Sequence, residues 1–333
     1  MEKMLIEFLE NLELGQVVSF RNMSVVPLFI RNGDGPQYIT MKDALENGTL
    51  IISEKSASGT VPELIAVNKG NAPVLLLDGE EVKGAKQNRI LNTTVLLKED
   101  SETVIPVSCT EQGRWNYTTQ NFGDSEMVTA HKIRVNKNIS VRQSLDMGGN
   151  YRADQGRVWN DIREYSLAAN VASPTGAMRD VFEQKSADIN DYLKSFAISP
   201  GQKGIFVFLK GEIIGFDFIS LASAYEKLHL KLLKSYAMDA ILQKESDKKY
   251  EAEPTKAKDM LDVLKVSAEK IFDSVGYGRD HRLKGNGVIG SCLEYKDTVI
   301  HMACFKVEEA GGTNLDEIGN IAGYRSRRNS RSQ

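Results

Sequence analysis

The fold of this chain is decided by the stretch Val74-Leu-Leu-Leu-Asp-Gly-Glu-Glu-Val-Lys-Gly-Ala-Lys-Gln-Asn-Arg-Ile-Leu-Asn-Thr-Thr-Val-Leu-Leu97. Its two ends, residues 74–77 and 90–97, are apolar runs of the length of buried strands. Between them, residues 78–89 form the densest polar cluster of the chain, with far more charges than a plain hairpin loop needs. Charge pattern alone favours a solvated connection whose charges compensate one another. The alternative is a binding or catalytic site, because the cluster carries groups for acid/base and anion-binding chemistry.

Around this stretch the sequence changes from strand-rich to helix-rich. Short apolar runs separated by Gly, Asn or Asp predict strands through residues 17–110, with one short helix near 40–46. The polar segment 113–151 is interpreted as a loop with irregular pieces. Ser173-Pro174 resembles an N-cap followed by the first position of a helix. Helical spacing of apolar residues then predicts helices over residues 152–170, 174–197 and 221–236.

The C-terminal part returns to strands. Residues 204–219 predict a hairpin, residues 255–272 a helix, and residues 288–293 with 298–307 a strand pair. A strand-rich N-terminal half, helices in the middle and a C-terminal strand pair predict an α+β fold rather than alternating α/β.

The composition is that of an ordinary globular protein, with 333 residues and a net charge of −3. It excludes a largely disordered chain, a collagen and a coiled-coil rod. The near-neutral charge gives no reason to expect duplex DNA as a partner.

Three cysteines, sparse and odd in number, favour buried thiols in a reducing cytoplasm. The acidic first ten residues do not fit a signal peptide, and no apolar window is long enough to predict a membrane span.

Two further patterns favour structural explanations. Gly285-Asn-Gly-Val-Ile-Gly290 matches a dinucleotide-binding pattern, but the polar residues 279–284 before it predict no strand, and a hairpin is expected after it. Glycines that permit a turn are the preferred explanation. His301 and Cys304 are expected to lie on opposite faces of one strand, so that they cannot share a metal ion. We therefore predict no metal site.

Two more polar clusters are candidates for a site. The first, Cys109–Trp115, follows a strand that ends at Val107. An indole beside a guanidinium and a carboxylate at a strand exit suits a base or a ribose, although a loop tryptophan is more often a core plug. The second, Gly278–Arg282, is glycine-flanked and is expected between a helix and a strand.

Two of these segments together resemble a known family. Gly79-Glu-Glu-Val-Lys-Gly-Ala-Lys-Gln-Asn-Arg89 and Ile105-Pro-Val-Ser-Cys-Thr-Glu-Gln-Gly-Arg-Trp115 are similar to the ADP-ribosylglycohydrolase (ARG) and rhodanese-phosphatase superfamily associated protein domain family. Gly204-Ile-Phe-Val-Phe-Leu and Gly278-Arg-Asp-His-Arg fit its later segments. The resemblance implies one large α+β domain over residues 1–307. Residues 308–333 match nothing in the family and, with few apolar groups, are expected to form a basic, disordered tail.

The resemblance also implies an association with NAD and ADP-ribose handling, without an established reaction. It implies one shared site built from Glu81, Lys83, Gln87, Asn88, Arg89, Glu111, Gln112, Arg114 and Trp115. Within that set, Arg89 and Arg114 are expected to hold phosphate, and Trp115 to stack a base. Glu81 or Glu111 would be the catalytic acid/base if chemistry occurs.

The predicted function is therefore binding of an ADP-ribose-like or other phosphorylated nucleotide metabolite in an NAD-linked pathway, with its processing left open. The alternative is a non-enzymatic scaffold or accessory protein of a stress or phage-defence system. A carboxylate beside two guanidiniums in a closed pocket would favour an enzyme, and a self-paired network of the same groups would favour the scaffold. No cofactor follows from the sequence, and a homo-oligomer is compatible with it.

Overall fold

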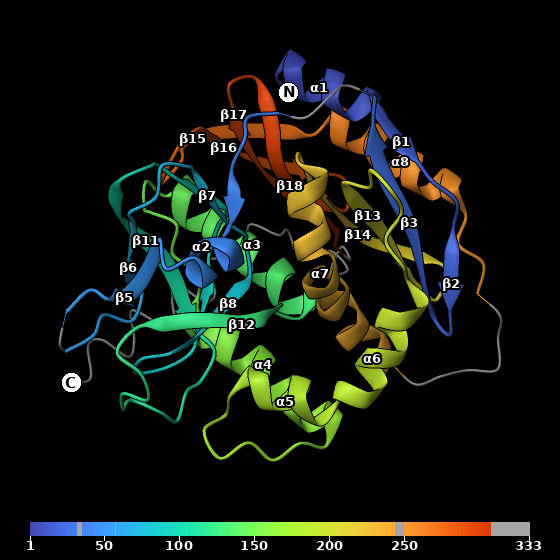
Figure 1. The fold of residues 1–333 in the computed structure, drawn as a ribbon. Helices are drawn as coiled ribbons and strands as arrows, with labels where there is room; N and C mark the ends of the chain where they lie inside the picture. Colours follow the sequence, from blue (N-terminus) through green and yellow to red (C-terminus); the bar gives the residue numbers. More distant parts are fainter. Residues whose placement is uncertain (32–34, 57, 244–249, 308–333) are drawn as a thin grey trace.

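The computed structural model describes residues 1–31, 35–56, 58–243 and 250–307. Six antiparallel strands close into a barrel in the order β11-β6-β5-β12-β8-β9, at the left of Figure 1. Their bounds are β5 Leu50–Glu54, β6 Glu63–Asn68, β8 Glu80–Gly84, β9 Arg89–Leu91, β11 Ser101–Cys109 and β12 Phe122–Val128. Alternate residues of these strands, such as Ile52, Ala66 and Val82, fill the barrel with apolar side chains.

A small sheet and a short helix lie beside the barrel. The sheet has the order β10-β7-β4, with bounds β4 Ile39–Thr40, β7 Val74–Leu76 and β10 Val95–Leu97. Helix α2 (Met41–Glu46) begins at a capping box, in which the Thr40 hydroxyl and the Asp43 carboxylate each accept a backbone N–H of the other residue. The predicted strand 74–77 is β7, whereas the run predicted as one strand over 90–97 is divided between β9 and β10, and β10 pairs with β7.

The second half of the molecule is a nine-stranded antiparallel sheet in the order β1-β3-β13-β14-β18-β17-β16-β15, with β2 paired to β3. Its bounds are β1 Leu12–Leu14, β2 Val18–Phe20, β3 Met23–Ile30, β13 Gly204–Leu209, β14 Glu212–Ile219, β15 Ala268–Asp273, β16 Arg279–Gly285, β17 Val288–Tyr295 and β18 Thr298–Lys306. Helices α1 (Lys3–Glu10) and α8 (Pro254–Lys265) pack on one face of this sheet.

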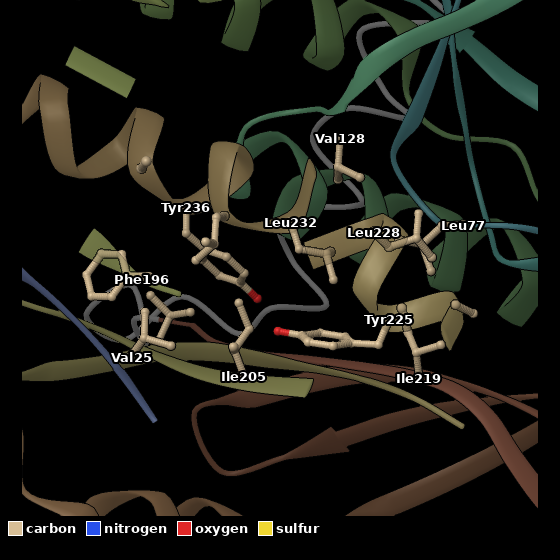
Figure 2. Packing of buried hydrophobic residues seen from close by; sticks show 14 of the residues in the cluster. Val25, Leu77, Val128, Phe196, Ile205, Ile219, Tyr225, Leu228, Leu232 and Tyr236 are labelled. Atoms are coloured by element: carbon tan, nitrogen blue, oxygen red, sulfur yellow. The ribbon is translucent and has the colours of Figure 1, made fainter. Parts of the chain in front are cut away.

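Helix α7 (Ala222–Leu242) covers the other face of the large sheet and connects it to the barrel side. Tyr225, Leu228 and Leu232 recur at helical spacing and are buried against the sheet residue Ile205. The same apolar cluster includes Leu77 and Val128 from the barrel side, and Figure 2 shows them facing α7. The core is therefore continuous between the two halves.

Four further helices pack beside the barrel, against α7 and against one another: α3 (His131–Asp146), α4 (Gln155–Ala169), α5 (Met178–Gln184) and α6 (Ser186–Ser195). They bury one apolar cluster that includes Ile90 of β9 and Met127 of β12. None of the helices in the described ranges is both long enough and apolar enough to span a lipid bilayer.

The α+β class is confirmed, with strands first, helices in the middle and strands last. The expected loop 113–151 was wrong in its second half, because β12 and α3 occupy it. Helix α3 shows no amphipathic pattern in the sequence because its buried face carries charged and polar side chains, among them Arg134, Lys137 and Asn138. Their ionic and hydrogen-bond partners, rather than apolar packing, satisfy that face.

Three predicted boundaries were also wrong. The helix expected from residue 174 begins at Met178, and the Ser173 hydroxyl instead accepts the N–H of Ala177 at 2.8 Å in the preceding turn. The helix expected to residue 272 ends at Lys265, and β15 follows it. The polar residues 279–285 form β16, so that the C-terminal strand pair is part of a four-strand meander. The prediction of one domain over residues 1–307 stays a prediction, and the tail 308–333 lies outside the described residues.

Candidate functional site

The two motif segments that carry the family resemblance lie side by side in the barrel wall. Arg89 on β9 is paired with Cys109 on β11. The N–H of Thr110 donates to the carbonyl of Asn88 at 3.0 Å, and the N–H of Asn88 donates to the Glu111 carboxylate at 3.2 Å. The polar cluster 78–89 is not the solvated connection that its charges favour, because it forms two strands whose Glu80, Glu81 and Arg89 are fully buried.

A strained turn joins β8 to β9 and is held by Arg114. Gly84 has φ 115 and Ala85 has φ 40, a region that residues with a side chain rarely adopt. Arg114 donates to the carbonyl of Ala85 at 2.7 Å and to the carbonyl of Gly84 at 3.3 Å. It also pairs with the Glu111 carboxylate at 2.6 Å. Arg114 therefore fixes the position of the turn that precedes Arg89.

A groove of about 600 Å³ runs between this turn, strand β12 and helix α5. We call it the main groove. Three cationic side chains line it: Lys83 from β8, Arg114, and Arg179 from α5. In the described part of the chain, the Lys83 ammonium has neither an ion pair nor a hydrogen bond. Arg179 binds Glu183 at 2.5 Å through Nε, and its Nη1 is buried without a hydrogen-bond partner among the described residues. The main groove therefore offers an anion the Lys83 ammonium, with the Arg179 guanidinium as a second positive charge in its wall.

Two glutamates of the predicted site are in opposite electrostatic states: Glu111 lines the main groove, whereas Glu81 is fully buried. Burial raises the pKa of Glu81 to about 7, although the hydroxyls of Ser125 (2.5 Å) and Thr110 (2.6 Å) donate to it and oppose the shift. Burial would also raise the pKa of Glu111. The bonds from Arg114 and from the Asn88 N–H and Thr175 hydroxyl outweigh burial there and lower it. Glu81 is therefore the carboxyl that can exchange a proton near neutral pH.

Arg89 and its neighbours face the inside of the barrel instead. Arg89 shares the inward side of β9 with Leu91, and its guanidinium lies 3.7 Å from the Glu54 carboxylate of β5. The Trp115 ring, 42% exposed, covers that guanidinium at 5.7 Å and also contacts the Lys86 ammonium. Burial raises the pKa of Cys109 in the same barrel end to about 11, so that it stays a neutral thiol.

The nine predicted residues thus separate into two groups. Glu81, Lys83, Asn88, Glu111 and Arg114 lie on or directly behind the main groove. By contrast, Arg89 and Trp115 lie at the end of the barrel interior. The side-chain oxygen of Gln87 accepts a hydrogen bond from the Arg89 guanidinium at 3.1 Å. The side-chain amide of Gln87 donates to the backbone carbonyl of Gln112, an exposed residue, at 3.4 Å.

Sequence reasoning missed three residues of these sites: Glu54, Ser125 and Arg179. Ser125 lies in the polar segment 113–151 and Arg179 in a predicted helix, outside the clusters chosen as candidate sites. Only the pairing of β12 with β8 and the packing of α5 bring them to Glu81. The pairing of β12 with β8 is irregular between Asp124 and Val128. Ser125 lies within this irregular part, and its hydroxyl donates a hydrogen bond to the Glu81 carboxylate. No motif would have marked them.

The remaining candidate patterns have structural explanations. The cluster Gly278–Arg282 is largely part of β16, where Arg282 binds Asp280 and Thr93 away from the main groove. The glycines of 285–290 form the β16–β17 hairpin, with Gly287 at φ 64, which confirms the turn interpretation. His301 binds Asp217 and Thr94, whereas Cys304 packs in the apolar cluster on the opposite face of β18. Within the described ranges, no group of three or more potential metal-binding side chains is found.

Comparison with known proteins identifies a family for the chain and no close relative. The model of the ARG and Rhodanese-Phosphatase-superfamily-associated Protein domain matches residues 11–305, which is most of the sequence. No curated protein and no solved structure matches the chain.

Proposed function

The chain belongs to the ARG and Rhodanese-Phosphatase-superfamily-associated Protein domain family, and from this premise we propose that it binds a phosphorylated nucleotide metabolite of the ADP-ribose type in the main groove. The observation that carries the proposal is the convergence of Lys83, Arg114 and Arg179 on one cavity of about 600 Å³. A cavity of this size is within the range of small-molecule sites.

Lys83 and Arg179 are the cations with free capacity for a ligand. Arg114 already donates to three carbonyls and a carboxylate, so that it contributes charge and support rather than a new bidentate contact. The Lys83 ammonium is the donor that a phosphate would satisfy, and the Arg179 guanidinium, which lines the same groove, adds positive charge beside it. The phosphate site we propose thus shifts from the pair expected from the sequence, Arg89 and Arg114, to Lys83 and Arg179.

Glu81 supplies the proton-transfer group if the bound metabolite is processed. A carboxyl with a pKa near 7 suits general acid/base work at neutral pH. Its side chain is buried, so that the Ser125 hydroxyl, which donates to it and lines an adjoining hollow, is the group through which a proton would pass. Glu111 is too strongly held as a carboxylate for this role.

Isothermal titration calorimetry with ADP-ribose tests the binding proposal. Lys83→Gln should weaken binding by about ten- to a hundredfold, because a charge-assisted bond contributes about 1.5–3 kcal/mol. Lys69→Gln is the matched control, since it removes the same charge from the exposed turn after β6. Equal affinities for all three proteins, or no binding by the unaltered protein, would contradict the proposal.

One observation favours a second function, that of a non-enzymatic accessory protein of a stress or defence system. Arg114 and Glu111 satisfy each other at 2.6 Å, as a fixed scaffold requires. Mass spectrometry of both the small molecules and the proteins that co-purify with the freshly purified protein separates the two functions. Recovery of a nucleotide phosphate supports the binding proposal, and recovery of partner proteins without any such metabolite supports the accessory one.

The proposal includes a cytoplasmic location. Cys109, Cys292 and Cys304 are all buried free thiols, which suits a reducing compartment and supports this location.

A further inference from the structure

A second hollow adjoins the main groove at Arg179. This hollow has a volume of about 240 Å³ and lies between β12 and the helices α5 and α6. Along β12 the main groove is lined by residues 121–123 and the second hollow by residues 125–127. Arg179 lines both, so that the two cavities are neighbours that share this side chain.

The second hollow differs from the main groove in its chemistry. Its inner wall is apolar and consists of Met127, Phe182 and Ile189, which are buried in one apolar cluster. Its polar groups are the Asn190 amide, the Ser125 and Ser186 hydroxyls, and the charged side chains of Glu126, Arg179, Glu183 and Lys234. In the described part of the chain the Asn190 amide makes no hydrogen bond, so that it can donate to and accept from a ligand at once.

We infer that the second hollow is the nucleobase subsite of the ligand whose phosphates lie in the main groove. The inference rests on the proposed function. An apolar wall with one free amide fits a planar adenine ring, because an asparagine amide matches the adjacent donor and acceptor on the adenine edge. The larger, cationic cavity then holds the phosphates, and the smaller, apolar cavity holds the ring.

This assignment also places the proton-exchanging group along the ligand. Ser125 lines the second hollow next to Arg179, and its hydroxyl donates to Glu81 at 2.5 Å. The ribose that joins the adenine to the phosphates must pass the boundary between the two cavities. Ser125 and Arg179 are therefore the side chains that face this ribose.

Calorimetry with two probes, ADP-ribose and inorganic pyrophosphate, tests the subsite. Asn190→Ala removes the amide, and Ser186→Trp places a large ring at the mouth of the hollow. Each should weaken ADP-ribose binding by about tenfold, the effect of losing one contact to the edge of the adenine ring, and should leave pyrophosphate binding unchanged. Asp188→Asn, an exposed position on the same helix outside the hollow, is the control and should change neither affinity.

The outcomes distinguish this inference from the proposed function. If Lys83→Gln weakens both probes while Asn190→Ala and Ser186→Trp leave ADP-ribose affinity unchanged, the subsite is wrong and the phosphate site stands. If the unaltered protein binds neither probe, the proposed function fails and the subsite fails with it. If Asn190→Ala or Ser186→Trp weakens pyrophosphate as strongly as ADP-ribose, the hollow does not hold the base.

Discussion

Arg114 connects the two family motifs through contacts to both of them. Replacing it by alanine removes its bonds to the carbonyls of Gly84 and Ala85 and leaves the mostly buried Glu111 carboxylate without its cation. We expect Arg114→Ala to lower the free energy of unfolding by about 3 kcal/mol, the lower end for breaking a buried ion pair. Urea denaturation measures the loss, and Arg163→Ala, an exposed arginine on α4, should change it by less than about 0.5 kcal/mol. An unaltered midpoint for Arg114→Ala would mean that the turn is held without it.

Glu81 should make stability depend on pH in an unusual direction. Its folded pKa is raised from 4.5 to about 7, so that the folded protein holds a proton there that the unfolded chain has lost. The contribution of Glu81 to the free energy of unfolding is therefore at its full value below pH 4.5. It falls by about 3 kcal/mol as the pH rises to 7. Glu81→Gln should remove this fall, and the difference between the two proteins in denaturation series from pH 4.5 to 8 measures it. Parallel pH profiles would show that Glu81 titrates normally.

At the scale of single residues, charge density predicted part of the candidate site. Glu81 and Lys83 stand in a polar cluster too dense for a hairpin. They share one face of β8 by alternation, where Lys83 lines the main groove and Glu81 is fully buried. The same alternation turns Arg89 inward, because it shares a face with Leu91. The sequence alone did not show that two basic residues of one motif would face opposite sides of a barrel wall.

At the scale of elements, the turn between β8 and β9 depends on a glycine. Gly84 has φ 115, and a Cβ there would collide with the Thr119 hydroxyl that accepts the Ala85 N–H. Gly84→Ala should therefore lower the free energy of unfolding by about 2 kcal/mol, through strain and the loss of that contact. Gly123→Ala on β12 is the matched control, because a Cβ there meets nothing within 4 Å. Thermal and urea denaturation of both variants measure the two losses in free energy of unfolding. Equal losses for Gly84→Ala and Gly123→Ala would refute the strain argument.

Elements were predicted well where apolar periodicity reports burial and poorly where ionic groups are buried. Helix α7 repeats Tyr225, Leu228 and Leu232 on one face, and the sequence predicts this helix and its start, although it ends at Leu242 rather than at residue 236. Strand β16 buries Asp280, His281 and Arg282, each with a polar partner, and so has the composition of a loop. Hydrophobic patterns cannot identify such elements, because partners far away in the sequence satisfy their side chains.

At the scale of the whole molecule, buried charges join the barrel side to the large sheet. Arg134 of α3 binds Asp217 of β14 at 2.9 Å, and Asp217 also accepts from Tyr236 at 2.7 Å and lies 3.3 Å from His301. Burial would raise the pKa of Asp217, but Arg134 and His301 hold it well below the ordinary value. A second bridge runs from Lys231 of α7 to Glu80 and Asp124 of the barrel.

These bridges predict that the two halves unfold together. If residues 1–307 form one domain, differential scanning calorimetry should show a single transition whose van't Hoff and calorimetric enthalpies agree. Asp217→Asn should lower that transition as a whole, with a loss of about 3–5 kcal/mol, because it leaves the fully buried Arg134 charge unpaired. Asp191→Asn breaks an exposed pair with Arg21 and should cost less than about 1 kcal/mol. A shared buried charge centre couples the unfolding of every element that contacts it, so that a single transition is expected. Two separate transitions, or a variant in which only one of two transitions shifts, would therefore show that the barrel and the sheet are independent domains.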